Sequence, residues 1–198
     1  RQKRRGRCGP VIRVLVVDDS ALIRRLLGEL FQGAGGFEVL RRQAAWVDPA
    51  VQIWNRSLAD NLTYSTAAGS TDRLPEAMEA ARLQEVAQRL PQGLRTELGE
   101  GGGRLSGGQG QRVRFGRGLM TDNVRLALLD EPFRGLDRDQ RRRLLAEARR
   151  WWRDATLICV THDLEETLGF PRVLVIEDGR IIEDGDPARL AAGASRYR

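Results

Sequence analysis

Short runs of aliphatic residues alternate along the chain with longer stretches in which apolar residues recur every three or four positions. The runs predict buried strands, and the recurring positions predict amphipathic helices with one apolar face. Runs of the first kind occupy 11–17, 37–40, 124–129 and 156–160. Periodic stretches occupy 21–30, 77–90 and 139–152. Strands and helices that alternate in this way predict an α/β fold with an open, mostly parallel sheet.

Two further regions complete this plan. Residues 64–95 carry helical periodicity and end at Pro91 and Gly93, which predicts an inserted helical subdomain within about 55–120. The apolar pairs and runs at 173–176 and 181–182 flank Asp178-Gly179, a favoured hairpin dipeptide. We therefore expect the sheet to finish with a β-hairpin.

The composition is that of an ordinary globular chain, with 41% hydrophobic and 30% charged residues in a length of 198. No apolar run reaches the roughly 18 residues that a membrane-spanning helix requires. Cys8 and Cys159 are far apart and form no metal-spaced pair, which favours a reducing compartment. The sequence begins with Arg1 rather than Met, which favours a fragment or a processed chain.

The net charge is +6, and Lys3 is the only lysine. Residues 1–10 contain a basic run, which we expect to be a solvated tail rather than a nucleic-acid site, because no aromatic residue interleaves to stack on bases. The five arginines Arg141, Arg142, Arg143, Arg149 and Arg150 of the helix at 139–152 are likewise expected to form a solvated face.

A glycine-containing stretch before a predicted helix has the chemistry of a phosphate site. It consists of Leu105, Ser106, Gly107, Gly108 and Gln109. The two glycines allow the backbone to approach an anion, the serine supplies a hydroxyl donor, and a helix that starts near Gln109 directs its positive end to the same point. A glycine pair before a helix is otherwise a common cap. Gly116 and Gly118 cost that helix about 1 kcal/mol each, so we expect it to rely on packing.

Three polar residues follow predicted strands. Asp130 and Glu131 come after the run at 124–129, and His162 comes after the run at 156–160. A carboxylate at this edge of a sheet can hold Mg²⁺ through water, and its neighbour can deprotonate a water molecule. A lone histidine often has no special role, but this one is the only histidine of the chain.

Four motifs in this order and spacing resemble those of ATP-binding-cassette (ABC) transporter ATPases. They are the signature motif at 105–109, a Walker B-like segment at 126–131, a D-loop at 135–137 and an H-loop at 161–163. The resemblance implies a P-loop NTPase-like fold that binds ATP and Mg²⁺. It gives Asp130 the Mg²⁺ role, Glu131 the role of general base, and His162 that of a γ-phosphate sensor. It also implies that the signature motif and Asp137 meet a second ATPase domain, with the motif closing over ATP held there.

Other segments are similar to exporter-type ATPases of this family. Residues 55–62 resemble the segment that follows the Q-loop, and 96–102 resemble a loop that contacts the membrane partner. Residues 45–54 occupy the place of the Q-loop, but Pro49 stands where the family has glutamine, and Gln52 is three positions away. The resemblance implies an ATPase domain at the cytoplasmic face of a membrane, attached through a transmembrane partner.

The sequence contains no GxxxxGK[ST] motif, in which backbone amides and a lysine hold the nucleotide phosphates. The first strand-to-helix turn has Asp18 and Asp19 instead. Two carboxylates repel a triphosphate unless a metal intervenes. We therefore expect a partial or degenerate ATP-binding domain that binds ATP poorly on its own.

Residues 14–27 resemble the start of response-regulator receiver domains, in which the acidic pair after the first strand holds Mg²⁺ beside a phosphorylated aspartate. Asp18 and Asp19 would be that pair, although two acidic residues are also favoured in the first turn of a helix. The phosphorylated aspartate should end a third strand, no such strand follows this unit, and the later lysine is missing. The predicted organisation is a tail at 1–10, a receiver-like strand-helix-strand at 11–40, which would replace the P-loop unit, and an ABC ATPase domain at 41–198.

Three functions are compatible with these motifs. The first is the ATP-binding domain of an ABC exporter, with the signature motif acting on ATP held by a partner domain. The second is a non-catalytic partner or regulatory module, or a non-functional hybrid, that does not bind ATP by itself. The third, which the missing residues disfavour, is a phospho-accepting signalling module.

Overall fold

The computed structural model describes residues 13–17, 43–64, 66, 71–178 and 180–192. These residues form one six-stranded sheet in the order β2-β3-β4-β1-β5-β6. The strands are β1 (Arg13–Val17), β2 (Ala44–Val47), β3 (Leu126–Asp130), β4 (Thr156–Val160), β5 (Val173–Glu177) and β6 (Arg180–Gly185). β6 pairs antiparallel with β5, and the other pairs are parallel. The predicted open, mostly parallel α/β sheet is therefore confirmed.

The strand predicted at 11–17 lies in the middle of the sheet as β1, between β4 and β5. The predicted strand at 37–40 and the helix at 21–30 lie outside the described residues. The sequence reading missed β2 and assigned its residues to a loop, because this strand is only four residues long. The hairpin at 173–182 is confirmed as β5 and β6.

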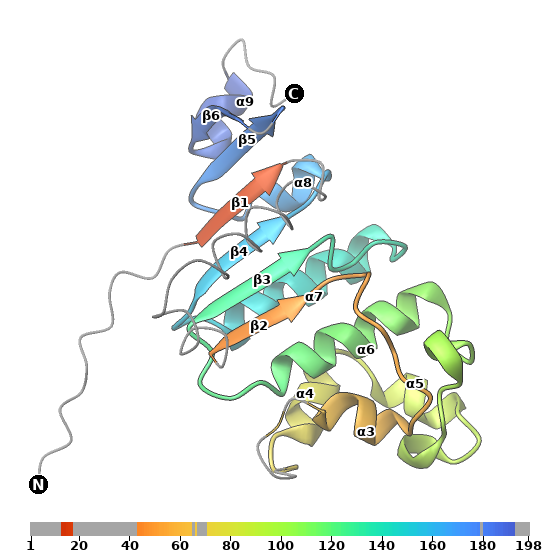
Figure 1. The fold of residues 1–198 in the computed structure, drawn as a ribbon. Coiled ribbons are helices and arrows are strands. Elements are labelled where there is room, and N and C mark those ends of the chain that lie inside the picture. The colour runs from red at the N-terminus through yellow and green to blue at the C-terminus, as the bar shows by residue number, and fades with distance from the viewer. Residues whose placement is uncertain (1–12, 18–42, 65, 67–70, 179, 193–198) are drawn as a thin grey trace, which may run out of the picture.

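Helices cover the sheet and extend beyond its β2 edge (Figure 1). The helices are α3 (Leu58–Thr63), α4 (Leu74–Ala80), α5 (Gln84–Arg89), α6 (Gly107–Leu119), α7 (Arg138–Trp151), α8 (Leu164–Thr167) and α9 (Pro187–Ala192), with 3₁₀ turns η2 (Gly93–Arg95) and η3 (Glu100–Gly102). α3, α4 and α5 gather in the predicted helical subdomain, away from the strands (Figure 1). Among the described residues, the longest helix has 14 residues, and no helix is long and apolar enough to cross a membrane.

α6 joins the helical subdomain to the sheet through close approaches at its two late glycines. A Cβ atom on Gly116 would lie 2.8 Å from Leu83 and 2.9 Å from Leu62, and one on Gly118 would lie 2.8 Å from Val47 of β2. No side chain fits in this space without displacing its neighbours. The expectation that this helix relies on packing is therefore borne out by its contacts.

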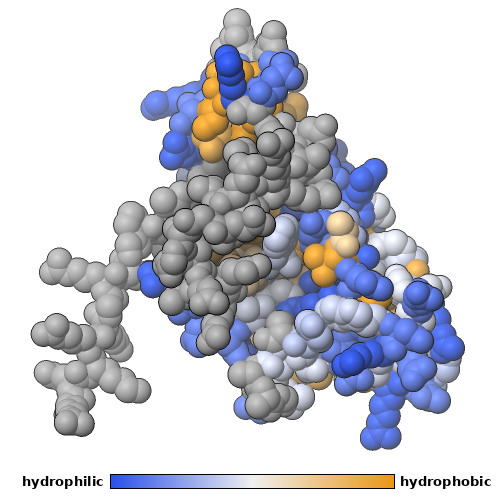
Figure 2. Space-filling view, viewed as in Figure 1, coloured by the Kyte–Doolittle hydropathy of each residue, from blue (hydrophilic) through white to orange (hydrophobic). Residues whose placement is uncertain are grey.

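Aromatic rings fill the layer between α6 and α7. The ring of Phe115 packs edge-on against Phe133 at 5.4 Å and against Trp152 at 5.9 Å between centroids. All three side chains are buried in one apolar core that extends under the strands. At the other end of the sheet, Ile181 and Ile182 of the edge strand β6 are exposed, and Figure 2 shows a hydrophobic patch over that end of the molecule.

Candidate functional site

Asp130 and Glu131 stand where β3 ends. Asp130 is the last residue of the strand and is buried, while Glu131 begins the following turn. The backbone of Glu131 has a φ of 39°, and its N–H donates to the carbonyl of Val160 at 2.9 Å. A left-handed conformation costs a residue with a side chain about 1–3 kcal/mol, so the surrounding hydrogen bonds must hold this turn in place.

His162 meets Glu131 at the adjacent strand end. Its Nε2 atom lies 2.9 Å from Oε1 of Glu131. The Glu131 side chain is 17% exposed and that of His162 is 57% exposed, so the pair has one sheltered and one open side. The strand register explains the contact, because Asp130 of β3 lies opposite Val160 of β4. The structure thus brings together the two residues that the sequence marked as catalytic.

A cavity of about 120 Å³ adjoins this pair. Its lining includes Glu131, Arg134, Arg141, Thr161, His162 and Glu166. Among the residues that the structure describes, no group of three histidine, cysteine or acidic side chains is arranged to hold a metal ion. Asp130 supplies a carboxylate oxygen, which is the kind of ligand that Mg²⁺ prefers.

The signature motif lies at the start of α6, and the helix begins two residues earlier than the sequence predicted. Gly107 is the first helical residue, and Ser106 is the N-cap. The Ser106 hydroxyl accepts from the N–H of Gln109 at 3.3 Å, and the N–H of Ser106 donates to the Gln109 side chain at 2.9 Å. This reciprocal capping box fixes the helix end. The Ser106 oxygen therefore acts as an acceptor here, in addition to the donor role predicted for it.

The two glycines of the motif have different surroundings. A Cβ atom on Gly107 would meet nothing within 4 Å. One on Gly108 would lie 2.5 Å from Cδ2 of Leu136. Gly108 therefore lies against the side chain of Leu136 in the D-loop segment, and Gly107 faces open space. Leu105, which precedes them, packs partly buried against the core.

Asp137 follows Leu136 and caps α7. Its carboxylate accepts from the N–H of Gln140 at 2.8 Å, and its side chain is on the surface. The signature motif and the D-loop segment are thus neighbours within this chain. The cavity beside His162 is lined by none of residues 105–109, so among the described residues the motif and the Glu131–His162 pair form two separate surfaces.

Two arginines of α6, which the sequence reading did not single out, hold the segment at the Q-loop position. Nε of Arg114 donates to the carbonyl of Val51 at 2.6 Å, and Nη1 of Arg117 donates to that of Gln52 at 3.0 Å. Arg117 also donates to the backbone and side-chain oxygens of Asn61 at 2.8 and 2.9 Å. Burial lowers the pKa of Arg117 to about 10. The side chain of Gln52 is itself exposed.

The predicted solvated face of α7 is wrong for two of its arginines. Nη1 of Arg141 lies 2.7 Å from Asp163 and 3.8 Å from Glu166. Arg149 stacks over the ring of Phe170 at 4.6 Å. Both contacts come from the segment after β4, which packs on α7 only in the folded chain, so the sequence of the helix gave no sign of them. Arg142 and Arg150 are exposed, as expected.

Burial raises the pKa of Glu166, and the charge of Asp163 acts in the same direction, whereas a hydrogen bond with Thr161 and the charge of Arg141 oppose the shift. Asp18 and Asp19, the predicted metal ligands of a receiver-like unit, lie outside the described residues. The receiver hypothesis and the boundaries at 10 and 40 therefore stay predictions.

Comparison with known proteins places these features in a family. The family model described as "ABC transporter" matches residues 23–134, more than half of the chain. The match begins inside the stretch that resembles a receiver domain, so the comparison does not support a separate receiver unit at 23–40.

Curated relatives are flippases or transport proteins by name. The chain is 34% identical over 158 residues to ATP-dependent lipid A-core flippase 1 of Colwellia psychrerythraea, which covers 80% of this chain and 26% of that protein. It is 35% identical over 158 residues to the glutathione/L-cysteine transport system ATP-binding/permease protein CydC of Escherichia coli, which covers 80% of this chain and 27% of that protein. The chain thus spans about a quarter of the length of these relatives.

A solved structure described as a bacterial Atm1-family ABC exporter with ATP bound has the same fold. The two superpose with a TM-score of 0.83 at 27% sequence identity, over 94% of this chain and 35% of that chain.

Proposed function

Since the chain belongs to the ABC transporter family, we propose that it is an exporter-type ATP-binding domain whose signature motif acts on ATP held by a partner domain. One observation supports this role most directly. Ser106 caps a 13-residue helix, and the adjacent Gly107 faces open space. The free N–H groups and the dipole of such a helix end attract phosphate oxygens. Leu105, Gly108 and Gln109 support this surface by packing and capping.

The chain's own sheet edge carries the second half of the proposal. Glu131 orients or deprotonates a water molecule, and His162, 2.9 Å away, holds the carboxylate in place and faces the solvent side. Asp130 contributes an acidic oxygen for Mg²⁺ that enters with the nucleotide. These roles are assigned by the family motifs, and the strand register supports them by placing the three residues at one edge.

This site lacks the residues that normally bind the nucleotide phosphates. The sequence has no GxxxxGK[ST] motif, and its only lysine is Lys3. Without successive amides and a lysine around the β- and γ-phosphates, the affinity for ATP falls. We therefore propose that the domain is partial or degenerate, with weak or absent turnover as an isolated chain.

Partners follow from the family. The relatives are named as flippases and as an ATP-binding/permease protein, and the structural neighbour as an exporter. We propose that this chain pairs with a second ABC ATPase domain, as a homodimer or heterodimer, and works with a transporter membrane domain at the cytoplasmic face. Asp137, on the surface beside the signature motif, belongs to the pairing surface in this proposal.

Calorimetric titration of the purified chain with Mg-ATP, beside Glu131→Gln, tests the nucleotide grip. We expect no micromolar binding to either protein. Micromolar binding together with turnover that Glu131→Gln abolishes would show that the chain has a complete ATP site of its own.

A hydrolysis assay tests the proposed role of the signature motif at residues 105–109. The chain is mixed with an ABC ATPase domain that has an intact P-loop, and ATP hydrolysis is followed. We expect the wild-type chain to change the rate at which the intact domain hydrolyses ATP. The Gly107→Val variant should leave that rate unchanged. Equal activity of the wild type and the variant would contradict the proposal.

The same mixture distinguishes this proposal from the alternative function, a regulatory module that acts without contacting ATP. The missing P-loop motif favours this alternative. Under it, the chain changes the rate of the intact domain, but Gly107→Val acts as well as the wild type, because the phosphate-facing surface is not used.

A further inference from the structure

The loop that carries His162 is held to α7 by arginines, and one of them contacts the residue next to the histidine. We propose that Arg141 is a positioning residue that fixes this loop and thereby sets the contact between His162 and Glu131. The catalytic meaning of that contact rests on the proposed function, whereas the contact itself is observable without nucleotide.

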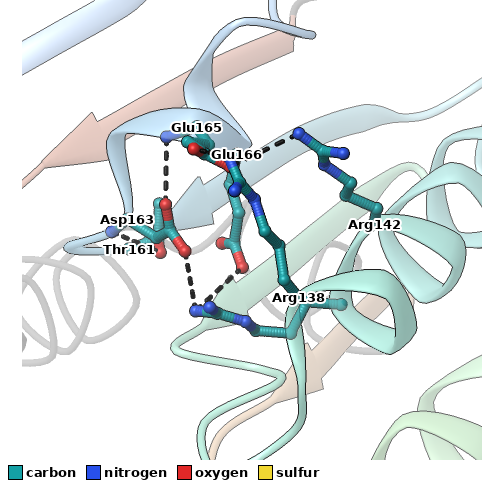
Figure 3. Close-up of polar contacts among 7 residues, drawn as sticks. Arg138, Arg142, Thr161, Asp163, Glu165 and Glu166 are labelled. Atoms are coloured by element: carbon teal, nitrogen blue, oxygen red, sulfur yellow. Dashed lines mark hydrogen bonds and ion pairs between the residues drawn. The ribbon is translucent and has the colours of Figure 1, made fainter.

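The geometry centres on one guanidinium nitrogen. Nη1 of Arg141 lies 2.7 Å from Oδ2 of Asp163 and 3.8 Å from Oε1 of Glu166. Figure 3 shows both carboxylates pointing toward α7. The side chains of Arg141, Asp163 and Glu166 are 28%, 25% and 7% exposed, so solvent screens these charges less than at an open surface. A charge-assisted contact in such a place is stronger than an exposed pair.

The two residues that flank His162 are both fixed. Thr161 is buried, and its hydroxyl accepts from the N–H of Asp163 at 3.1 Å. Asp163 also caps α8, with its carboxylate accepting from the N–H of Glu165 at 3.0 Å. His162 therefore sits between two anchored residues, and Arg141 supplies the anchor that comes from another element.

Removing the guanidinium would leave two carboxylates facing each other in a sheltered place. Asp163 and Glu166 repel one another when both are charged, and Arg141 offsets this repulsion. Relief of the repulsion would move Asp163 and, with it, the adjacent His162. A shift of about 1 Å is enough to break a hydrogen-bond contact of 2.9 Å.

Other arginines of α7 hold later parts of the same segment. Arg138 and Arg142 pair with Glu165, and Arg149 stacks on Phe170. Figure 3 shows Arg138 and Arg142 reaching from α7 toward Glu165. The Glu165 side chain is 41% exposed and that of Arg142 is 60% exposed. Arg142 is thus a matched control, because it has the same chemistry on the same helix but pairs with Glu165 instead of Asp163 or Glu166.

Arg141 also lies close to the start of α7 and to the loop before it. α7 begins at the cap Asp137, and Leu136 before it packs under Gly108 of the signature motif. Arg141 lies about one helical turn from that cap. Arg141 therefore links the loop at 135–137 to the segment that carries His162 through about one turn of helix.

The test uses NMR of the full chain with labelled histidine at one fixed pH. His162 is the only histidine, so its ring gives a single assignable signal. In the wild type, Glu131→Gln should shift that signal, because the ring loses a charged neighbour at 2.9 Å. In the Arg141→Gln background this response should be lost, and Arg141→Lys should restore part of it. In the Arg142→Gln background the response should stay as in the wild type.

Asp163→Asn is a second route if Arg141→Gln does not fold. Asparagine keeps an oxygen that can cap α8 but removes the charge that Arg141 binds. We expect the same loss of response to Glu131→Gln. The proposal is overturned if the response persists in Arg141→Gln or in Asp163→Asn, if Arg142→Gln abolishes it equally, or if Glu131→Gln leaves the wild-type signal unmoved.

Discussion

His162 and Glu131 contact each other through Nε2 and Oε1 at 2.9 Å, although they follow different strands. β3 and β4 are parallel neighbours in register, so the residues that follow them emerge side by side at the carboxyl edge of the sheet. The left-handed turn at Glu131 directs its carboxylate across that edge. The sheet therefore brings the two residues close, and the loop that carries His162, held to α7 by Arg141, sets the contact between them.

Replacing Glu131 by glutamine should remove any hydrolysis at the chain's own site and preserve the fold. Glutamine keeps the size of the side chain and removes its capacity as a base, a loss worth about 10²–10⁴-fold in rate. The measurement is phosphate release by the isolated chain, wild type beside Glu131→Gln. Glu147→Gln on the exposed side of α7 is the matched control and should act as the wild type does.

The two signature glycines should respond oppositely to alanine. Gly108→Ala forces a methyl group against Leu136 and should lower the free energy of unfolding by about 1–3 kcal/mol. Gly107→Ala enters open space in the first turn of the helix and should leave stability unchanged or slightly higher. Urea denaturation of both variants measures this, and equal destabilisation would contradict the difference in their surroundings.

Arg117→Met should destabilise the helical subdomain. Methionine fills much of the space but leaves the carbonyls of Asn61 and Gln52 without their donor, at a cost on the order of 2–3 kcal/mol. Chemical unfolding gives the free energy, and the fluorescence of Trp54, whose ring lies 4.1 Å from the guanidinium, reports the local change. Arg104→Met, at an exposed position, should have no comparable effect.

Glu166→Gln should become more favourable relative to the wild type as the pH rises from about 4.5 to 7. Burial raises the pKa of Glu166 above its model-compound value of 4.5, so near that pH the folded chain binds more protons than the unfolded chain. Stability from this group is complete below 4.5 and is lost as the pH rises through the folded pKa. Glutamine does not titrate and avoids this loss.

Thermal unfolding of the wild type and Glu166→Gln across that pH range measures the difference between them. A difference in Tm that stays constant with pH would show that Glu166 does not titrate differently in the two states. Glu147→Gln again serves as the control, since its side chain lies toward the surface of α7.

Periodicity predicted most of the sheet and helices because the elements are long or strongly apolar. The strand at 156–160 matches β4 residue for residue, and the helix at 139–152 is displaced from α7 by one residue at each end. β2 was missed because four residues carry too little pattern to separate a strand from a loop. The start of α6 was placed late because the capping box, not the glycines, decides where the helix begins.

The sequence by itself determined the family motifs, most of the strands and helices, and the placement of Asp130, Glu131 and His162 at strand ends, since each depends on residues close together along the chain. The tertiary structure alone decided that Gly108 packs on Leu136, that Arg117 holds the carbonyl of Gln52, and that Arg141 meets Asp163. Each of these contacts joins separate elements. Their partners are chosen by how the elements pack, and the sequence of one element does not contain that information.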